Sequence, residues 1–244
     1  MLFNYNKFQV KKQLLIFSYI FFFCATMSTA VASNKAPVLK PLTTQQVALI
    51  IKRSNFEKSF HISATPDVVG EINALRRSEQ AGSYMRECLH RMNQYLPVIQ
   101  KALNITAMPI ELLAIPLIES GYQPLVENKN PTLASGIWQL MPKTARHFGL
   151  IVKAKHDDRL NTLLETNAAV TYLNAMHDQF NDWKLVVIAY KIGEDKTEEL
   201  IKAVGSRDAS VLIHSSKAPR HLKKYISMFD STVIIIRNPS LIAE

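Results

Sequence analysis

The sequence predicts a mainly α fold, on three observations. The chain has 244 residues, of which 48% are hydrophobic, 20% are charged and only 7 are Gly, a composition typical of a globular protein rich in helix. Apolar residues recur every three or four positions in several long segments, as they do in amphipathic helices. Start and stop signals bracket those segments, for example Asp182 and Gly193. A chain of this length can bury a sizeable core without disulfides or a metal.

The first 32 residues have the three parts of a secretory signal peptide. Three lysines precede the apolar run LLIFSYIFFFCATM, and the tripeptide AVA at its small-residue end stops at Ala32. Since the run is short for a membrane span, we expect cleavage after Ala32 and export to the periplasm or cell envelope, the alternative being an uncleaved amino-terminal anchor. Cleavage would leave Cys88 as the one remaining cysteine, which we expect to be buried.

The charge of the mature chain favours anionic partners of the cell envelope. Removing three lysines from 29 basic residues leaves 26 against 20 acidic ones, a net charge of +6. No dense basic patch with interleaved aromatic residues is present, so nucleic acid is not expected as a partner.

The segment 33–84 reads as a linker followed by helices. Residues 33–45 are polar and carry two prolines, while the helical pattern begins near Gln46 and pauses at a loop around Pro66. An amphipathic helix is predicted from Glu79 to Leu103, with Pro97 expected to bend or interrupt it.

The stretch MPIELLAIPLIESGYQP predicts a helix that is buried nearly all round. Pro109 suits its first turn, Pro116 should kink it, and Gly121 is a C-cap. Further helices are predicted over 142–149, 160–180 and 183–193, and from Pro219 onward. The late run TVIIIRN is compatible with a strand or with the end of the last helix.

Glu119 stands at the end of this apolar helix and is the first candidate for chemistry. Withheld solvation and the negative end of the helix dipole both favour its protonated form, and no cation adjoins it in the sequence. A carboxyl group that keeps its proton near neutral pH can act as a general acid. Gln139 and Tyr190, two polar residues set in apolar sequence, are candidate partners for it.

Together these segments resemble the catalytic domain of the lytic transglycosylase (SLT, goose-lysozyme-like) family. Its first motif is similar to ES at 119–120, its second to GIWQLMPKTA at 136–145 and its third to AYKIG at 189–193. The segment DDR at 157–159 also fits, and the layout is most similar to the membrane-bound lytic murein transglycosylase D branch. The resemblance covers 85–205.

The resemblance implies a lysozyme-like helical fold, with 33–84 as an additional N-terminal helical segment and 206–244 as a C-terminal helical extension. It also implies cleavage of the β-1,4 bond between N-acetylmuramic acid and N-acetylglucosamine in peptidoglycan. In this family the muramic 6-hydroxyl attacks in place of water and leaves a 1,6-anhydro end. The family requires no cofactor.

Site residues carry over from the family motifs position by position. Glu119 would act as acid and then as base, and Tyr190 would hydrogen-bond and orient its carboxyl group. Ser120 would support the backbone of the first motif, and Gln139 and Met141 would line the sugar subsites.

Two positions depart from the family pattern. Lys191 stands where the third motif usually has Asn, and its ammonium would either act on Glu119 or point outward. Asn128 stands where relatives often carry a serine that contacts sugar, in a loop about two residues longer than usual. These departures leave a second function open, namely a peptidoglycan-binding or sensing module that has lost turnover.

A third hypothesis for the function is a hydrolytic lysozyme. It would need a second carboxylate across the bond, for which Glu127, Asp157 and Asp158 are the candidates. The seven histidines show no metal-ligand spacing, so we expect no metal site.

Overall fold

The computed structural model of the protein describes residues 38–126 and 133–243, and it confirms the mainly α class. The predicted signal peptide lies outside the described residues. The α-helices are α2 (Thr44–Ser54), α3 (Pro66–Arg77), α4 (Glu79–Ile105), α5 (Ala114–Ser120), α6 (Pro142–His147), α7 (Thr162–Phe180), α8 (Trp183–Ile192), α9 (Glu194–Val204), α10 (Ala209–His214) and α11 (Leu222–Arg237).

Short 3₁₀ turns and two small antiparallel strand pairs complete the described elements. The 3₁₀ turns are η2 (Lys58–Phe60), η3 (Ile110–Leu113), η4 (Asp158–Leu160) and η5 (Pro239–Leu241). The strand pairs are β1 (Leu125–Val126) with β2 (Ser135–Gly136), and β3 (Val152–Lys153) with β4 (His156–Asp157).

Side-chain caps begin most of the long helices where the sequence places them. The side chains of Thr43, Thr65, Ser78, Asn161 and Asp182 each accept a hydrogen bond from a backbone N–H in the first turn of α2, α3, α4, α7 and α8. Each cap satisfies a donor that has no partner inside its helix, which is why these residue types mark the helix starts.

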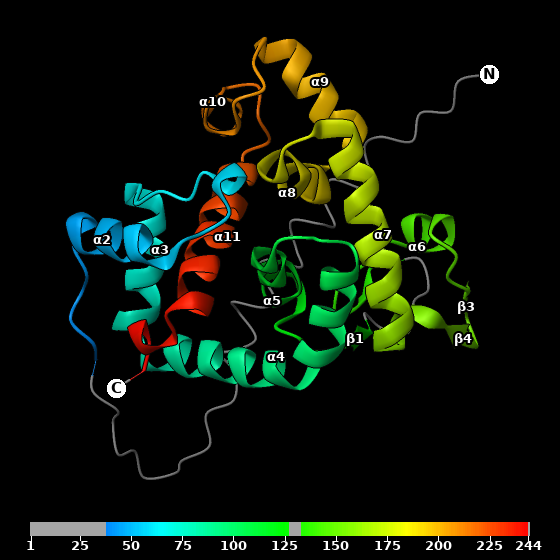
Figure 1. Ribbon diagram of the computed structural model, residues 1–244, viewed down its shortest axis with the longest axis horizontal. Coiled ribbons are helices and arrows are strands. Elements are labelled where there is room, and N and C mark those ends of the chain that lie inside the picture. The colour runs from blue at the N-terminus through cyan, green and yellow to red at the C-terminus, as the bar shows by residue number, and fades with distance from the viewer. Residues whose placement is uncertain (1–37, 127–132, 244) are drawn as a thin grey trace. The chain divides into compact units, whose positions relative to one another are not determined.

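The helix α4 continues through Pro97 instead of stopping there. Proline has no N–H to donate to the preceding turn, so a bend is the expected consequence. The axis of α4 changes direction part-way along its length (Figure 1). Of the two outcomes expected at Pro97, a bend or an interruption, the structure has the bend, and the helix is continuous.

The buried stretch before Glu119 is divided into two pieces. Pro109 precedes the 3₁₀ turn η3, and the α-helical part α5 begins only at Ala114. The change of helix type thus falls before Pro116, where a kink was expected. Glu111 in η3 is 5% exposed and accepts a hydrogen bond from Arg237 at 2.9 Å, which ties this turn to the end of α11.

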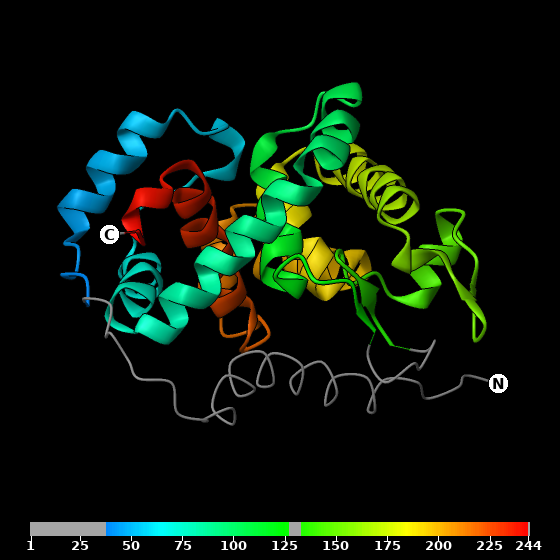
Figure 2. The same ribbon diagram turned by 90° about the horizontal axis from the view of Figure 1, so that it is seen from below.

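The helix α11 packs against α3, α5 and α8. Both views place it between the N-terminal helices α2 and α3 on one side and α5 and α8 on the other (Figures 1 and 2). One core cluster joins α2, α3 and the end of the chain: Val47, Val68, Val69, Ile72, Ile234, Ile235 and Ile242. The TVIIIRN run is therefore mostly the last part of a helix.

Since α11 packs on the helices that precede and include the first motif, the C-terminal segment is part of the same compact unit, 38–244. The boundaries at residues 84 and 205 stay a prediction. Within the described residues, none of the helices combines the length and the apolar content that a membrane crossing requires.

Candidate active site

Glu119 lies in the last turn of α5, with its side chain 15% exposed. Gly121 ends the helix in the left-handed conformation, with φ of 60°. A Cβ at this position would lie 2.8 Å from the Tyr84 hydroxyl oxygen and 2.9 Å from Cys88 Sγ. The position therefore favours glycine, because its φ is positive and because a side chain there would collide with its neighbours.

The turn that carries Glu119 is held from two sides. Arg91 Nε on α4 donates to the backbone oxygen of Gly121 at 2.8 Å. Ser120 is 1% exposed, and its hydroxyl lies 3.0 Å from the oxygen of Pro116 and donates to that of Ile137 at 2.7 Å. Ser120 was expected to support the backbone of the first motif, and its buried hydroxyl joins α5 to the second motif.

The backbone of the second motif is held by Glu165, in the first turn of α7. Its carboxyl oxygens accept hydrogen bonds from the backbone N–H groups of Ile137 and Trp138, each at 2.9 Å. Burial raises the pKa of Glu165 well above its usual range, against the lowering effect of those two hydrogen bonds. A Cβ on Gly136 (φ 83°) would lie 2.1 Å from the oxygen of Arg159 and 2.2 Å from the Glu165 carboxyl group.

Arg159 supports the same loop from beneath. It is fully buried, and its guanidinium donates to the backbone oxygens of Leu133 at 2.6 Å and Leu140 at 2.9 Å. Asp157 pairs with it through two contacts of 2.9 and 2.6 Å. Burial would raise the pKa of Asp157, but the hydrogen bonds and charge of Arg159 hold it below its usual value.

Gln139 is half-buried at the tip of this loop. It takes a left-handed conformation, with φ of 52°, and its Nε2 donates to the backbone oxygen of Gly136 at 2.6 Å. Met141, also half-buried, is the residue from which α6 begins. Both side chains thus sit where the second motif turns into a helix.

The Glu119 carboxyl group has a cation beside it. Lys191 Nζ on α8 lies 3.8 Å from Glu119 Oε1, and its side chain is only 10% exposed. The same ammonium lies 4.7 Å from the centre of the Tyr225 ring, within range of a cation–π interaction. Of the two orientations considered for Lys191, the structure has the inward one. Glu119 therefore has no cation among its neighbours in the sequence but has one beside it in the folded protein.

Two tyrosines approach Glu119 from different helices. Burial, followed by the charge of Glu119, raises the pKa of both Tyr225 and Tyr190 well above the usual range. Tyr190 does not make the expected hydrogen bond to the carboxyl group, because its hydroxyl donates to the backbone oxygen of Trp138 at 2.6 Å. The hydroxyl of Tyr225 on α11 is fully buried, and its interaction with Glu119 contributes to its raised pKa.

The structure thus brings Glu119, Ser120, Tyr190, Lys191 and the second motif together from α5, α8 and the loop before α6. Asn128 and Glu127 lie outside the described residues. In the part of the chain that the structure describes, no group of three His, Cys, Asp or Glu side chains could hold a metal ion.

Sequence reasoning missed three supporting residues. Glu165 and Arg159 are charged residues that become 1% and 0% exposed, and their partners are backbone groups that no side-chain pattern reveals. Tyr225 was read as one apolar position in the stripe of the last helix. Its distance of more than a hundred positions from Glu119 left no local signal for the contact.

Residues 97–213 match the family of the Transglycosylase SLT domain. This part of the chain is similar to the SLT domain. The chain is 30% identical over 157 residues to membrane-bound lytic murein transglycosylase D of Escherichia coli strain K12, an alignment that covers 64% of this chain and 34% of the relative. It is 29% identical over 150 residues to a putative tributyltin chloride resistance protein of Alteromonas sp. strain M-1, covering 61% of this chain and 71% of the relative.

The chain therefore spans about a third of the length of the Escherichia coli relative. The matched SLT region includes all three motifs and ends within α10, before α11. Tyr225 thus reaches the site from beyond the matched region. A carboxyl group in this setting can exchange a proton with a bound ligand, and the half-buried Gln139 can offer it an amide.

Proposed function

We propose that this protein is a lytic transglycosylase that cleaves the bond between N-acetylmuramic acid and N-acetylglucosamine in peptidoglycan. The observation that carries the proposal is the placement of one carboxyl group, that of Glu119, at the end of a buried helix. It lies beside two tyrosines and the third motif, and its turn is hydrogen-bonded to the second motif, in a chain whose residues 97–213 are similar to the SLT domain.

The reaction uses Glu119 twice. The protonated carboxyl group first gives its proton to the glycosidic oxygen as the C1–O bond breaks and the N-acetylglucosamine side leaves. The carboxylate then takes the proton from the muramic 6-hydroxyl as its oxygen bonds to C1, which closes the 1,6-anhydro ring. The carboxyl group ends protonated as it began, so one residue suffices for the cycle.

The other site residues prepare Glu119 for these transfers. Tyr225 interacts with the carboxyl group through its buried hydroxyl, and the Tyr190 hydroxyl donates to the backbone oxygen of Trp138, which precedes Gln139. Gln139 and Met141 meet the sugar, while Ser120 keeps α5 and the second motif in register.

A second function, a glycan-binding module with little turnover, is favoured by one observation. An ammonium 3.8 Å from Glu119 Oε1 stabilises the carboxylate and so opposes the acid step. Hydrolysis has less support, because Asp157 is paired with Arg159, and Asp158 accepts from the backbone N–H of Ile151 at 2.7 Å and lies 2.7 Å from His156.

Digestion of purified peptidoglycan followed by mass spectrometry tests the proposal. The wild-type chain should release fragments with 1,6-anhydromuramyl ends, and Glu119→Gln should release none. Glu198→Gln, at a half-exposed position of α9, is the matched control and should cleave normally. Reducing muramic ends would instead indicate hydrolysis, and glycan binding without any product would indicate the binding module.

We also propose that the chain is exported to the periplasm or cell envelope. The support is the predicted signal peptide and the substrate class, which is found there. Mass spectrometry of the protein isolated from its cells should give a mature chain that begins at Ser33. A chain that retains residues 1–32 in the cytoplasm would contradict export.

A further inference from the structure

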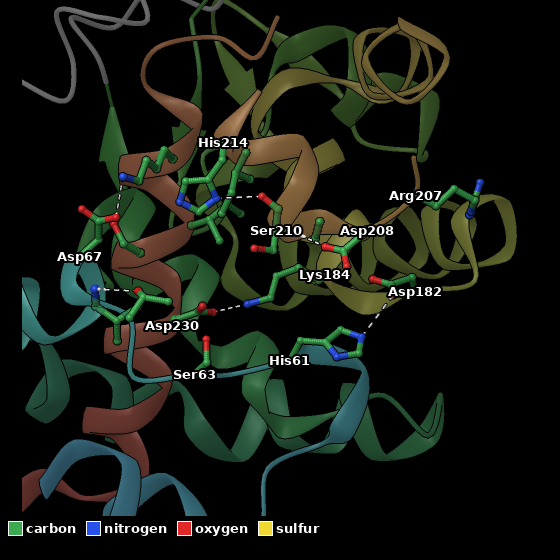
Figure 3. Close-up of a pocket in the computed structure, with 17 residues that line it drawn as sticks. His61, Ser63, Asp67, Asp182, Lys184, Arg207, Asp208, Ser210, His214 and Asp230 are labelled. Atoms are coloured by element: carbon green, nitrogen blue, oxygen red, sulfur yellow. Dashed lines mark hydrogen bonds and ion pairs between the residues drawn. The ribbon is translucent and has the colours of Figure 1, made fainter. Parts of the chain in front are cut away.

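A pocket lies apart from Glu119, where four segments of the chain meet (Figure 3). These segments are the loop 61–65 with the start of α3, the start of α8, the segment 207–214 that includes α10, and one side of α11. Its volume is about 310 Å³. Within the described residues, its lining includes neither Glu119 nor any residue of the second and third motifs. It is therefore a separate site on the same two helices, α8 and α11, that frame the candidate active site.

A buried ion pair crosses the pocket. Lys184 on α8 points across to Asp230 on α11, as Figure 3 shows, and their side chains are 4% and 9% exposed. Burial raises the pKa of Asp230, and the Lys184 ammonium offsets this only in part. A buried ion pair is seldom more stabilising than apolar side chains of similar size. Its presence beside a cavity therefore points to recognition more than to stability.

The rim repeats the same pattern of opposite charges. Lys223 Nζ lies 2.7 Å from the Asp67 carboxylate, and both side chains are 44% exposed. His61 Nε2 lies 3.9 Å from Asp182. Counting Arg207 and Asp208, the lining has three Lys or Arg side chains against four Asp. A lining so close to neutral favours neither a polyanion nor a polycation, whereas a ligand with one charge of each sign could pair with both.

The size and the remaining lining narrow the ligand class. About 310 Å³ is at the small end of ligand sites, which suits an amino acid or a dipeptide. Three serines offer hydroxyl groups, and the apolar side chains in the described lining are small: Val68, Ala209, Ile213 and Ile226. No Trp, Tyr or Phe ring on which a sugar could stack is among the lining residues that the structure describes.

We propose that this pocket binds a small zwitterion, the end of a short peptide that carries both a free ammonium and a free carboxylate. The ligand carboxylate would pair with Lys184 or Lys223, and the ligand ammonium would pair with Asp230 or Asp67.

The position of the pocket suggests where such a peptide end would come from, and this step rests on the proposed function. Lys184 and Lys191 are seven residues apart on α8, about 10 Å along the helix axis. A four-residue peptide spans up to about 14 Å when extended. A peptide attached to a glycan strand held near Glu119 is thus long enough to cover that separation.

Calorimetric titration of the full mature chain with alanyl-alanine tests the proposal. Binding should be detected for the dipeptide and should weaken at least tenfold when its amine is acetylated or its carboxylate is amidated. Lys223→Gln and Asp67→Asn, both at exposed positions, should weaken binding by a similar factor. The matched control is Lys224→Gln with Glu71→Gln, the neighbouring α11–α3 ion pair, which does not line the pocket.

The buried pair is tested by Lys184→Met combined with Asp230→Leu, which should abolish binding. Circular dichroism and peptidoglycan binding report whether this double variant folds. If it does not fold, the Lys223→Gln and Asp67→Asn variants still test whether the pocket binds the dipeptide. No binding at millimolar dipeptide, or equal binding of the doubly blocked dipeptide, would overturn the proposal. Equal binding of inorganic phosphate would reduce the pocket to a simple anion site and would also overturn it.

Two further arms separate this inference from the proposed function. Titration needs no turnover, so the Glu119→Gln chain should bind the dipeptide normally even if the wild type cleaves nothing. A disaccharide-tetrapeptide that binds more tightly than the dipeptide, and loses this advantage in the rim variants, would assign the ligand to wall strands. Equal affinities would assign the pocket to free peptides.

Discussion

Replacing Lys191 by Met should make the proposed enzyme faster. The substitution keeps an apolar side chain of similar length against the Tyr225 ring and removes only the ammonium. Because this ammonium attracts the negative charge of Glu119 and the acid step needs the neutral carboxyl group, its loss should raise the rate of cleavage.

The magnitude follows from the separation of 3.8 Å. Coulomb's law gives about 1 kcal/mol for two unit charges at this distance in water and about 4 kcal/mol at an effective dielectric constant of ~20. Side chains that are 10% and 15% exposed lie between these limits, and we take ~2 kcal/mol, which corresponds to roughly thirtyfold in rate.

The assay is release of anhydromuramyl ends from peptidoglycan, with kcat and KM measured separately. The other groups near the ammonium are the Tyr225 ring and His221, whose pKa is lowered by burial and then by the Lys191 charge. Lys202→Met, at an exposed position on α9, is the control and should match the wild type. A Lys191→Met rate equal to or below the wild-type rate would refute the reasoning.

Three more predictions concern the support of the site. Tyr225→Phe should lower kcat about tenfold through the loss of the polar interaction between its hydroxyl and Glu119, with an unchanged Tm in calorimetry; an unchanged kcat would leave Tyr225 a packing residue. Gly136→Ala should lower the free energy of unfolding by ~3 kcal/mol or more, since its Cβ would meet a backbone oxygen at 2.1 Å. Urea denaturation measures this loss, with Gly149→Ala, which has open space but a similar φ, as the control. Glu165→Gln should cost about 1–3 kcal/mol because its amide group can accept only one of the two backbone N–H bonds. The substitution should also weaken the pH dependence of the free energy of unfolding. The raised pKa of Glu165 means that the native carboxyl group keeps a proton that the unfolded chain has lost above about pH 4.5. The stability of the wild type relative to the variant should therefore fall from pH 5 to pH 8.

The sequence was sufficient for the helices because their signals are local. The capping residues before α7 and α8, the glycine after Glu119 and the apolar spacing of the last helix depend only on neighbours a few positions away. At the two prolines inside predicted helices, the competing effects were also local but nearly equal in size. At Pro97 the surrounding helix tolerates the missing hydrogen bond, and before Pro116 the chain changes helix type earlier than the proline alone requires.

The residues of the candidate site were predictable, but their contacts were not. Glu119 and Gln139 stood out as polar groups in apolar sequence, and the family motifs gave them roles and drew attention to Lys191. The ammonium beside Glu119 comes from a helix 72 positions later, and the buried clamps made by Glu165 and Arg159 act on backbone groups. These contacts depend on how the helices pack against one another, and the spacing of residues along the chain does not predict them.

The place of α11 in the fold sets an order for making the protein. Glu119 is synthesised near the middle of the chain, but the helix that covers α3, α5 and α8 and brings Tyr225 to it is translated more than a hundred residues later. Until then three apolar helix faces have nothing to pack on. A chain that ends before α11 would therefore lack Tyr225 at its site and would expose apolar surface. We expect cellular quality control to treat such a chain as an unfolded protein.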